Sequence, residues 1–569
     1  MCGISGYLGR KSIDKELFTS AVNSLKHRGP DNEKVIFETH DKFKLNLALG
    51  HNRLSIIDLN ERSNQPFIDG NQILVLNGEI YNFMSLRKDL KGKGVHFETK
   101  SDTELLIKLY KFYGIEEALN LIEGMFAFFI YDPEKGIAFL ARDKFGIKPL
   151  LYYQSEEDLF FSSELKAIKK YFSKINFEIS EEAKASFFYH RYELEPNSIF
   201  EDIKMLKSGH YLTYDLKNKS QKIKPYWSLD IKSSKNDENK VIDQVEELLF
   251  ESVNENLISD VPVSLAFSGG LDSSLILAMA QKSNREIKAF TINRGDNDID
   301  YKYAKKISRY LNLDLTPINF KDISKKSVDH LFSIYDQPIG CSSIFSTFAL
   351  FREISKYGFK VTLLGDGGDE LFGGYNWYNQ YLKSSFSCKN LILNPKKVVK
   401  NNMLLNYQNE VERYKKIMLN RFSEEEIKDQ LKIDSNTTCY RLYEDIMNEM
   451  GLDEIRTVKD LMAIDFNSFL KYALLRADFS SMANSIEARV PFLNTKLVEY
   501  AFKISPKLIH KNNIPKYILK KVAERYLPKE LVYRPKKGFS SPVTNILPIS
   551  NGQEFQIHIF NKWQEIHAD

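Results

Sequence analysis

Ser268-Gly269-Gly270-Leu271-Asp272-Ser273-Ser274 lies between two segments of different periodicity. The apolar run at residues 262–267 before it predicts a buried strand, and residues 274–280 after it predict the start of a helix. The first N–H groups of a helix have no internal partners, and the helix dipole places positive charge beside them. This stretch therefore predicts an α/β unit with a phosphate site where the strand ends.

The residue types in this turn suit a phosphate that is bound together with a cation. Gly269 and Gly270 allow the backbone to approach an anion with positive φ, while Ser268 and Ser273 add hydroxyl donors. Asp272 would repel a polyphosphate unless a metal intervened, so it predicts a Mg²⁺ ligand. The lysine of a nucleoside-triphosphatase P-loop is missing, and the alternative is a surface turn with an ordinary helix cap.

The composition is that of a globular protein with more than one core. The chain has 569 residues, of which 43% are hydrophobic and 27% charged, and this length favours two to four domains. Basic and acidic residues number 80 and 76, so the net charge of +4 gives no reason to expect nucleic acid or an anionic membrane as a partner. With no long apolar stretch and no signal-peptide pattern at the start, we expect a cytoplasmic protein.

The four cysteines, Cys2, Cys341, Cys388 and Cys439, are too widely spaced for a zinc site or a disulfide framework. Cys2 differs because removal of Met1 would place its thiol and an α-amine on one residue. Such an amine is neutral often enough near physiological pH to act as a general base for the thiol. The alternative is an incidental cysteine, although the small-residue run that follows predicts a buried strand.

Three polar clusters follow that an amide-hydrolysing thiol would need. Arg53 could clamp a carboxylate, Asn77 and Gly78 could form an oxyanion hole at a turn that ends a strand, and Asp102 could accept from an ammonium group. Each has a simpler explanation: a surface ion pair for Arg53, a hairpin turn for Asn77-Gly78, and a helix cap for Asp102.

The ordered set of motifs resembles the class II glutamine amidotransferases and, with the loop at residues 268–274, the glutamine-hydrolysing asparagine synthetases over nearly the whole chain. The motifs that carry the resemblance are Cys2-Gly3-Ile4, His27-Arg28-Gly29-Pro30-Asp31, Arg53-Leu54-Ser55-Ile56-Ile57-Asp58, Asn77-Gly78-Glu79-Ile80-Tyr81-Asn82, Ser101-Asp102-Thr103-Glu104, Gly124-Met125-Phe126-Ala127-Phe128 and Arg142-Asp143-Lys144-Phe145-Gly146-Ile147-Lys148-Pro149-Leu150.

For residues 2–227 the resemblance implies an N-terminal-nucleophile hydrolase fold, an α+β sandwich of two antiparallel sheets between helices. Cys2 would attack the glutamine side-chain amide, and Asn77 and Gly78 would stabilise the oxyanion. The residues expected to bind glutamine are Arg53, Leu54, Ile57, Asn77, Glu79 and Asp102. The family passes the released ammonia through an internal tunnel, which needs apolar walls because water at neutral pH would protonate ammonia.

Alternating strand and helix signals from residue 241 to 569 predict a parallel, doubly wound sheet whose ligands lie at the carboxyl ends of the strands. Residues 232–240, polar and poor in helix signals, are the predicted linker, and residues 243–257 are predicted to be helical. An acidic, glycine-rich turn follows the strand at residues 361–364. A calcium loop is the alternative there, but the EF-hand spacing is missing.

The resemblance implies an adenine-nucleotide α-hydrolase fold for this second part. It assigns ATP binding to Ser268, Gly269, Gly270, Asp272, Ser273, Ile292, Leu364 and Gly365, and Mg²⁺ to Asp272 and Asp369. It also implies catalytic roles for Asp366 and for Lys536, the better match to the family lysine that contacts the polyphosphate. Dimerisation through the first domain is a further family expectation.

The chain departs from well-known asparagine synthetases near the reacting centre. Asp366 stands where Glu is common and Gly368 where Ser is common, Asn494 follows the motif that ends at Leu493 where Asp is usual, and residues 383–435 predict a variable helical insertion. Three functions follow as hypotheses: amidation of aspartate through β-aspartyl-AMP, amidation of a sugar carboxylate for surface polysaccharide, and a nitrogen-sensing protein that has lost turnover. Intact Cys2 and Asp272 argue against the last.

Overall fold

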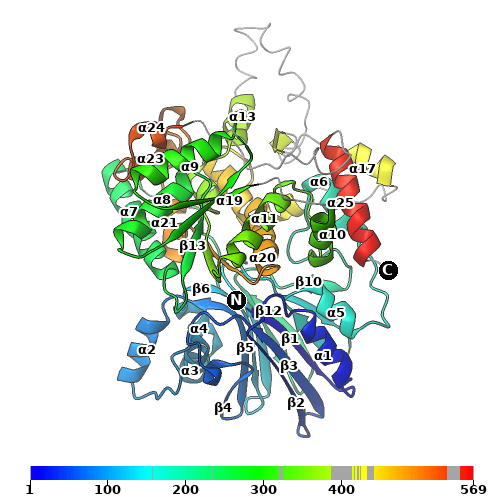
Figure 1. The fold of residues 1–569 in the computed structure, drawn as a ribbon. Helices are drawn as coiled ribbons and strands as arrows, with labels where there is room; N and C mark the ends of the chain where they lie inside the picture. Colours follow the sequence, from blue (N-terminus) through cyan, green and yellow to red (C-terminus); the bar gives the residue numbers. More distant parts are fainter. Residues whose placement is uncertain are drawn as a thin grey trace.

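The computed structural model describes residues 2–156, 158–232, 235–295, 297–319, 325–385, 413–414, 417–418, 422, 424–431, 441–534 and 551–567. Two units stack on one another, with the sheets of the first at the bottom of Figure 1 and the helix-rich second unit above them. The amino end lies between the two units. The start of the chain is therefore placed where both units can contribute to its surroundings.

The first unit contains two six-stranded sheets in the orders β10-β8-β9-β1-β3-β2 and β12-β11-β7-β6-β5-β4, in which every pairing is antiparallel. Their strands are β1 (Cys2–Gly9), β2 (Asn32–His40), β3 (Leu45–Arg53), β4 (Phe67–Asp69), β5 (Gln72–Ile80), β6 (Gly124–Asp132), β7 (Ile137–Arg142), β8 (Leu151–Gln154), β9 (Asp158–Ser162), β10 (Ile203–Met205), β11 (His210–Asp215) and β12 (Gln221–Pro225).

Helices cover both outer faces of this sandwich. The first sheet packs against α1 (Lys15–Asn23) and α5 (Leu165–Tyr171), and the second against α3 (Asp102–Tyr113), which is flanked by α2 (Phe83–Gly92) and α4 (Ile115–Leu121). Apolar side chains from both sheets, such as Ile4 and Phe129, form one core between them. Every residue of β1 is buried, which confirms the prediction of a buried strand at the amino end.

The second unit is built around a five-stranded parallel sheet in the order β15-β14-β13-β16-β17. Its strands are β13 (Val263–Ala266), β14 (Lys288–Asn293), β15 (Leu315–Asn319), β16 (Val361–Leu363) and β17 (Glu487–Arg489). The order reverses between β13 and β16, so the loops after these two strands lie side by side at the edge where ligands bind in such sheets. The predicted fold class is confirmed.

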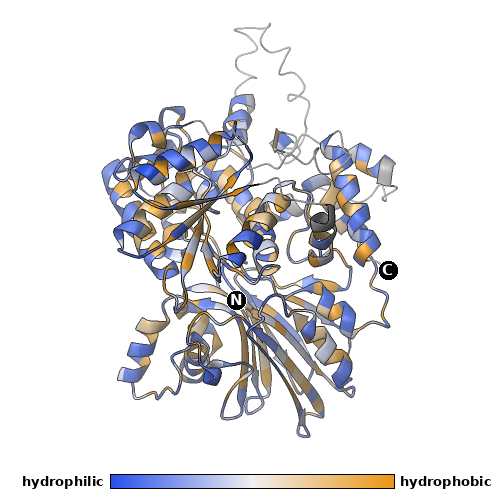
Figure 2. Ribbon diagram, in the orientation of Figure 1, coloured by the Kyte–Doolittle hydropathy of each residue, from blue (hydrophilic) through white to orange (hydrophobic). Residues whose placement is uncertain are grey.

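Helices surround this sheet (Figure 1), and those that cover the sheets carry alternating hydrophilic and hydrophobic stripes in Figure 2. The other described helices are α6 (Glu181–His190), α7 (Glu238–Asn256), α8 (Leu271–Lys282), α9 (Ile299–Tyr310), α10 (Lys325–Ile334), α11 (Ser343–Lys356), α12 (Gly368–Phe372), α13 (Asn376–Ser385), α17 (Glu424–Leu431), α18 (Arg441–Glu449), α19 (Val458–Asn467), α20 (Phe469–Met482), α21 (Thr495–Lys503), α22 (Pro506–Ile509), α23 (Tyr517–Ala523), α24 (Lys529–Val532) and α25 (Gly552–His567). Of these, α8, α9, α11 and α20 contact the strands of this sheet.

Two helices begin earlier than the sequence predicted. The side chain of Asp237 caps α7 by accepting from the Lys240 N–H at 3.3 Å, so the predicted linker at residues 232–240 already contains helix. Likewise α8 begins at Leu271 rather than at Ser274, because Gly270 is its N-cap. Asp272 and Ser273 therefore belong to the first helical turn.

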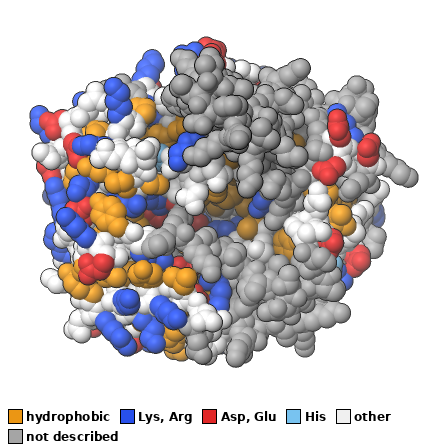
Figure 3. Space-filling view, turned by 90° about the horizontal axis from the view of Figure 1, so that it is seen from above, with side chains coloured by type: hydrophobic (Ala, Val, Ile, Leu, Met, Phe, Trp, Pro, Cys, Tyr) orange, Lys and Arg blue, Asp and Glu red, His pale blue; other side chains and the backbone are white. Residues whose placement is uncertain are grey.

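Most of the predicted insertion at residues 383–435 lies outside the described residues, and α17 is a described helix within it. Among the described helices, none combines the length and apolar character that crossing a membrane requires. On the face that Figure 3 draws, the described residues include both acidic and basic side chains, in keeping with the small net charge of +4.

Candidate functional site

The first centre lies at the start of β1. Cys2 is 6% exposed and pairs with Arg53 of β3. Its backbone nitrogen, which is the α-amine in a chain that has lost Met1, donates to Asn77 Oδ1 at 3.0 Å. Burial raises the pKa of the Cys2 thiol. A buried thiol of raised pKa needs a base to become a nucleophile, and the α-amine of the same residue can supply one once Met1 is removed.

Asn77 and Gly78 lie inside β5, opposite Ala127 and Phe126 of β6, so the predicted strand-ending turn is wrong. Pairing along the whole of β5 overrides the turn preference of Asn-Gly. Gly78 has φ 152°, and a Cβ there would lie 2.1 Å from the Met125 carbonyl oxygen, so this approach requires glycine. The Asn77 Nδ2 atom is buried and has no hydrogen-bond partner. A buried amide N–H that has no partner and lies beside a thiol can donate a hydrogen bond to an oxyanion that forms there.

Acidic side chains lie beside this centre. Ser101 caps α3 by accepting from Glu104 N–H at 3.2 Å, whereas Asp102 Oδ2 accepts from Ile80 N–H at 3.0 Å. Asp102 is thus not the cap of its helix. Burial raises the pKa of Asp102 to about 6 and the pKa of Glu79 well above its usual value, and Glu79 Oε2 has no hydrogen-bond partner. These carboxyl groups can accept a ligand's ammonium group.

The second unit contributes a buried pair to the same neighbourhood, which the sequence did not predict. Glu487 and Arg489 of β17 are fully buried and form an ion pair at 2.5 Å. Burial is the largest cause of the raised pKa of Glu79, and the negative charge of Glu487 is the second largest. Both residues lie in a motif that the sequence analysis identified, but no local pattern indicated contact with the first unit.

Arg53 holds the loop that follows it. Its guanidinium donates to the carbonyl oxygens of Asn60 at 2.9 Å and Ile57 at 3.2 Å and to Asn64 Oδ1 at 2.8 Å. Leu54 is 3% exposed, and its backbone N–H faces the Cys2 thiol. The predicted glutamine contacts of Arg53, Leu54 and Ile57 stay predictions: the structure places Arg53 and Leu54 next to Cys2, and Ile57 is held by Arg53 through its carbonyl.

The second centre is the loop between β13 and α8. Ser268 Oγ lies 3.1 Å from Ser273 Oγ and accepts from Gly270 N–H at 3.2 Å. Gly269 adopts φ 66°, whereas Gly270 does not have positive φ. The loop therefore presents two hydroxyl groups and the start of a helix to one side, as a phosphate site requires.

The loop after β16 packs on this first loop. A Cβ on Gly365 would lie 3.1 Å from Ser273 N, and a Cβ on Gly368 would lie 2.8 Å from Asp272 Cγ. The departure at position 368 therefore has a structural reason: a serine in this backbone would press on the Asp272 carboxylate.

Lys516 joins the two loops and is a residue that the sequence analysis missed. Its Nζ lies 2.6 Å from Asp272 Oδ1 and 2.7 Å from Asp369 Oδ1, and the side chain is 6% exposed. Burial opposes its charge, but the carboxylates of Asp272 and Asp369 raise the pKa of Lys516 overall. The chain thus places a buried ammonium beside the loop predicted to bind phosphate, where it can stabilise negative charge.

Lys536, the predicted lysine of this site, lies outside the described residues. Its neighbour Arg534 is described and donates to Asp300 Oδ1 at 3.0 Å, and a Cβ on Gly270 would lie 3.8 Å from its guanidinium. Ile292 is buried in β14, and Leu364 donates its N–H to the Arg489 carbonyl at 2.8 Å. The carboxyl end of the sheet therefore gathers the predicted ATP-site residues that are described.

Asp366 lies on the side of this centre that faces α20. Burial raises the pKa of its carboxyl group, and Arg476 Nη2 donates to its Oδ1 at 3.3 Å. Arg476 Nη1 also donates to Ser343 Oγ at 2.8 Å. This hydroxyl oxygen lies 3.0 Å from Cys341 Sγ. This cluster of a guanidinium, a carboxyl group, a hydroxyl and a thiol can bind a polar acceptor.

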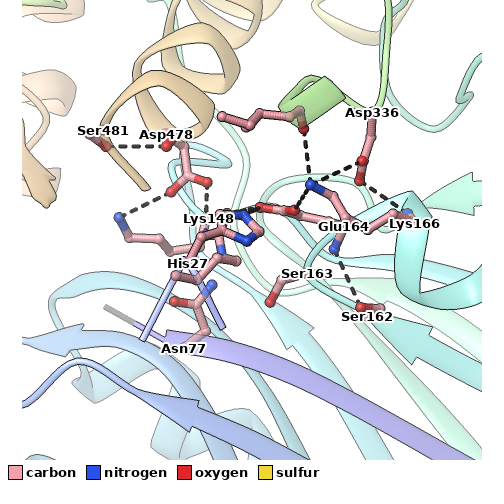
Figure 4. Close-up of polar contacts among 12 residues, drawn as sticks. His27, Asn77, Lys148, Ser162, Ser163, Glu164, Lys166, Asp336, Asp478 and Ser481 are labelled. Carbon is pink, nitrogen blue, oxygen red and sulfur yellow. Dashed lines mark hydrogen bonds and ion pairs between the residues drawn. The ribbon is translucent and has the colours of Figure 1, made fainter. Parts of the chain in front are cut away.

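A small cavity of about 10 Å³, large enough for about one water molecule, lies between the two units. It is lined by Ile147 and Lys148 of the first unit and by Leu474, Ala477, Asp478, Ala488 and Val490 of the second. Arg28 connects its wall to the first centre, because Nη2 donates to Asp478 Oδ2 at 2.8 Å and Nε to the Cys2 carbonyl at 3.1 Å. Figure 4 shows Asp478, Lys148 and Asn77 gathered in this region.

The donor set fits a magnesium ion at the second centre. Asp272 and Asp369 converge on one cation, the Lys516 ammonium, and carboxylate oxygens are the ligands that Mg²⁺ prefers. Within the described residues, no group of three or more His, Cys, Asp or Glu side chains could by itself hold a metal. The chain would thus supply two carboxylates, and phosphate oxygens and water would complete the coordination.

A buried cysteine at the start of a two-sheet sandwich, linked through Arg28 to a unit with a parallel sheet of the nucleotide-binding type, is the arrangement of a glutamine-dependent amidotransferase with a ligase unit. The family model described as glutamine amidotransferase domain matches residues 1–227, and the one described as asparagine synthase matches residues 244–565. The chain belongs to the asparagine synthase family, and it is an ATP-dependent ligase.

Curated relatives cover almost the whole chain. Asparagine synthetase [glutamine-hydrolyzing] 1 of Bacillus subtilis is 31% identical over 96% of this chain and 88% of its own. Asparagine synthetase [glutamine-hydrolyzing] 3 of the same organism is 30% identical over 95% of this chain and 87% of its own. An enzyme named amidase chyE from Penicillium rubens is 27% identical, with 95% of this chain and 89% of its own covered.

Proposed function

We propose that this ligase transfers the amide nitrogen of glutamine to the side-chain carboxylate of aspartate, with ATP as the activating substrate. Cys2 and its surroundings release ammonia, and the loops after β13 and β16 activate the acceptor. The proposal rests chiefly on one observation: Arg28 contacts both the carbonyl of Cys2 and Asp478 in the wall of the interdomain cavity.

At the first centre the Cys2 thiol attacks the glutamine amide carbon, and the α-amine takes the thiol proton. Asn77 Nδ2, which is buried and has no partner, donates to the oxyanion together with the Gly78 N–H. The protonated α-amine returns this proton to the leaving nitrogen, so ammonia leaves as the γ-glutamyl thioester forms, and water then releases glutamate and restores the thiol. Glu79 and Asp102 hold the ammonium group of glutamine.

At the second centre a carboxylate oxygen of the acceptor attacks the α-phosphorus of ATP, and pyrophosphate leaves. A free carboxylate is a poor electrophile, whereas the acyl adenylate carries AMP as a leaving group that ammonia can displace. Ser268, Ser273 and the start of α8 bind the phosphates, and the Lys516 ammonium stabilises the charge that develops on them. Asp272 and Asp369 would hold Mg²⁺, which would neutralise part of the polyphosphate charge.

A Cys2→Ala variant tests this division of labour. It removes the thiol but leaves the second centre unchanged, so synthesis with added ammonia should continue while synthesis with glutamine should stop. Equal loss of both activities would contradict the proposal. AMP and glutamate are measured in the same samples.

Amidation of a sugar carboxylate is the second candidate function. It is favoured by the acceptor cluster, the name we give to Cys341, Ser343, Asp366 and Arg476. Ser343, Cys341 and Arg476 present a hydroxyl, a thiol and a guanidinium, which suit an acceptor rich in hydroxyl groups. Pyrophosphate release with aspartate and with nucleotide-linked uronic acids separates the two candidates. Release with uronates alone would replace aspartate as the acceptor.

A further inference from the structure

A network of charges, buried at Arg28, Glu164 and Asp336 and half-buried at Lys166, joins the two units beside Cys2 (Figure 4). Glu164 Oε1 accepts from Arg28 Nη1 at 2.7 Å, and Glu164 Oε2 lies 2.9 Å from Lys166 Nζ. Lys166 then crosses to the second unit, where its Nζ lies 3.5 Å from Asp336 Oδ1 and its backbone N–H donates to Asp336 Oδ2 at 3.2 Å. The side chains of Glu164 and Asp336 are each 1% exposed.

Asp336 is close in sequence to the acceptor cluster. Only residues 337–342 separate it from Ser343, which accepts from Arg476. The Lys166 ammonium also donates to the Ile334 carbonyl at 3.1 Å, so it holds the backbone immediately before Asp336 as well. The indole of Trp563 donates to the Asp336 carbonyl at 3.0 Å, which fixes this segment from its other side.

The contacts close into a ring between the two centres. One path runs from the Cys2 carbonyl through Arg28, Glu164 and Lys166 to Asp336 and the segment that ends at Ser343. The other path runs from Arg28 to Asp478, which lies on α20. Arg476 is two residues earlier on the same helix, and its guanidinium donates to Ser343 and Asp366. Both paths begin at the same guanidinium and end at the acceptor cluster.

We propose that Lys166 is a positioning residue that fixes the acceptor segment relative to Cys2, so that ammonia released at one centre meets an activated acceptor at the other. This proposal rests on the function proposed above. Lys166 contacts neither nucleophile nor nucleotide loop, and its effect is exerted through Asp336 and Glu164. Loss of Lys166 should therefore raise the amount of glutamate released per AMP formed, while the rate of each separate reaction changes little.

The neighbours of Lys166 can tolerate its loss. Glu164 keeps Arg28 and His27, which lies 3.1 Å from Glu164 Oε1. Burial already raises the pKa of Asp336, so this carboxyl group can take up a proton when its partner is removed. A buried ion pair is weak evidence for stability, and its best-attested use is to specify one arrangement over others. This makes a coupling defect the expected result rather than unfolding.

The test compares Lys166→Met with Lys170→Met, a change at an exposed position of the same helix α5. Three rates are measured: glutamate release without ATP, ammonia-dependent AMP formation, and both products together with glutamine. We expect Lys166→Met to keep the first two rates within about twofold, while glutamate released per AMP rises by about fivefold or more, the lower end of typical coupling between sites. Lys166→Arg should restore part of the coupling, and Lys170→Met should match the wild type.

The proposal is overturned if Lys166→Met produces glutamate and AMP in the wild-type proportion, or if both separate reactions fall in the same proportion as the coupled one. Asp336→Asn breaks the same pair from the other unit and should give the same excess of glutamate. If neither variant folds, the pair determines folding and the positioning role is withdrawn. Failure of the division of labour itself is distinguished by Cys2→Ala, which would then lose ammonia-dependent synthesis.

Discussion

Replacing Lys516 by Met should abolish most of the ligase reaction and leave glutamine hydrolysis intact. The Lys516 side chain is 6% exposed and its ammonium contacts Asp272 and Asp369 within 2.7 Å, so it is fixed in place before any charge develops on the phosphates. Removing one such preorganised group from a water-excluded site costs roughly 3–4 kcal/mol of transition-state stabilisation. We therefore expect ammonia-dependent AMP formation to fall by about 10²- to 10³-fold.

The assay follows pyrophosphate and AMP with saturating ammonia, and glutamate release from glutamine serves as the internal control. Lys520→Met, one turn further along α23, is the matched variant, because Lys520 is half-buried and contacts the ring of Tyr533 instead of the loops. Lys516→Met with near wild-type AMP formation would refute the role of the ammonium. An equal fall in Lys520→Met would refute its specificity.

Three further predictions follow from the two centres. Asn77→Ala removes the unpartnered buried donor and should lower glutamine hydrolysis by about 10²- to 10³-fold, while ammonia-dependent synthesis persists; a drop of less than threefold would contradict the oxyanion role. Gly368→Ser introduces atoms where a Cβ lies 2.8 Å from Asp272 Cγ, so it should impair AMP formation by roughly tenfold, and unchanged kinetics would show that the loop yields. Burial raises the pKa of Asp102 to about 6, so this carboxyl group favours the folded state only at low pH, and its contribution is lost as the pH rises through 6. The melting temperature of Asp102→Asn should therefore be higher than that of the wild type at pH 8 and equal to it at pH 4. The same difference in melting temperature at both pH values would contradict the raised pKa.

Local patterns were sufficient to predict the parallel sheet and the two loops that follow its central strands, whereas the antiparallel sheets were expected from the family resemblance. The strand, glycine-rich turn and helix at residues 262–280 identified the nucleotide-type sheet, because strand and helix periodicities differ within a few residues. Cys2 and Asn77 were also predicted, and the structure joins them by a hydrogen bond. The same local reasoning was wrong about Asn77-Gly78, since a turn preference cannot register that β6 pairs with both residues.

Residues brought in from distant segments could not be predicted in this way. Lys516 follows Pro515 in a stretch with no glycine or acidic residue that would indicate a site. It contacts Asp272, which is 244 positions earlier in the sequence, only because of the tertiary fold. Lys166 and Asp336 are 170 positions apart, and neither lies in a pattern that indicates an ion pair. Charged residues are common on surfaces, so burial of a specific pair becomes visible only in three dimensions.

The central claim is that nitrogen released at Cys2 reaches the acceptor inside the protein. The direct measurement supplies amide-¹⁵N glutamine together with an excess of unlabelled ammonium and determines the isotope in the amide product by mass spectrometry. Internal transfer predicts that the product is enriched in the label of glutamine well above the isotope ratio of the ammonium in solution. A label diluted to the bulk ratio would contradict the account, because the ammonia would then have left the protein before it reacted.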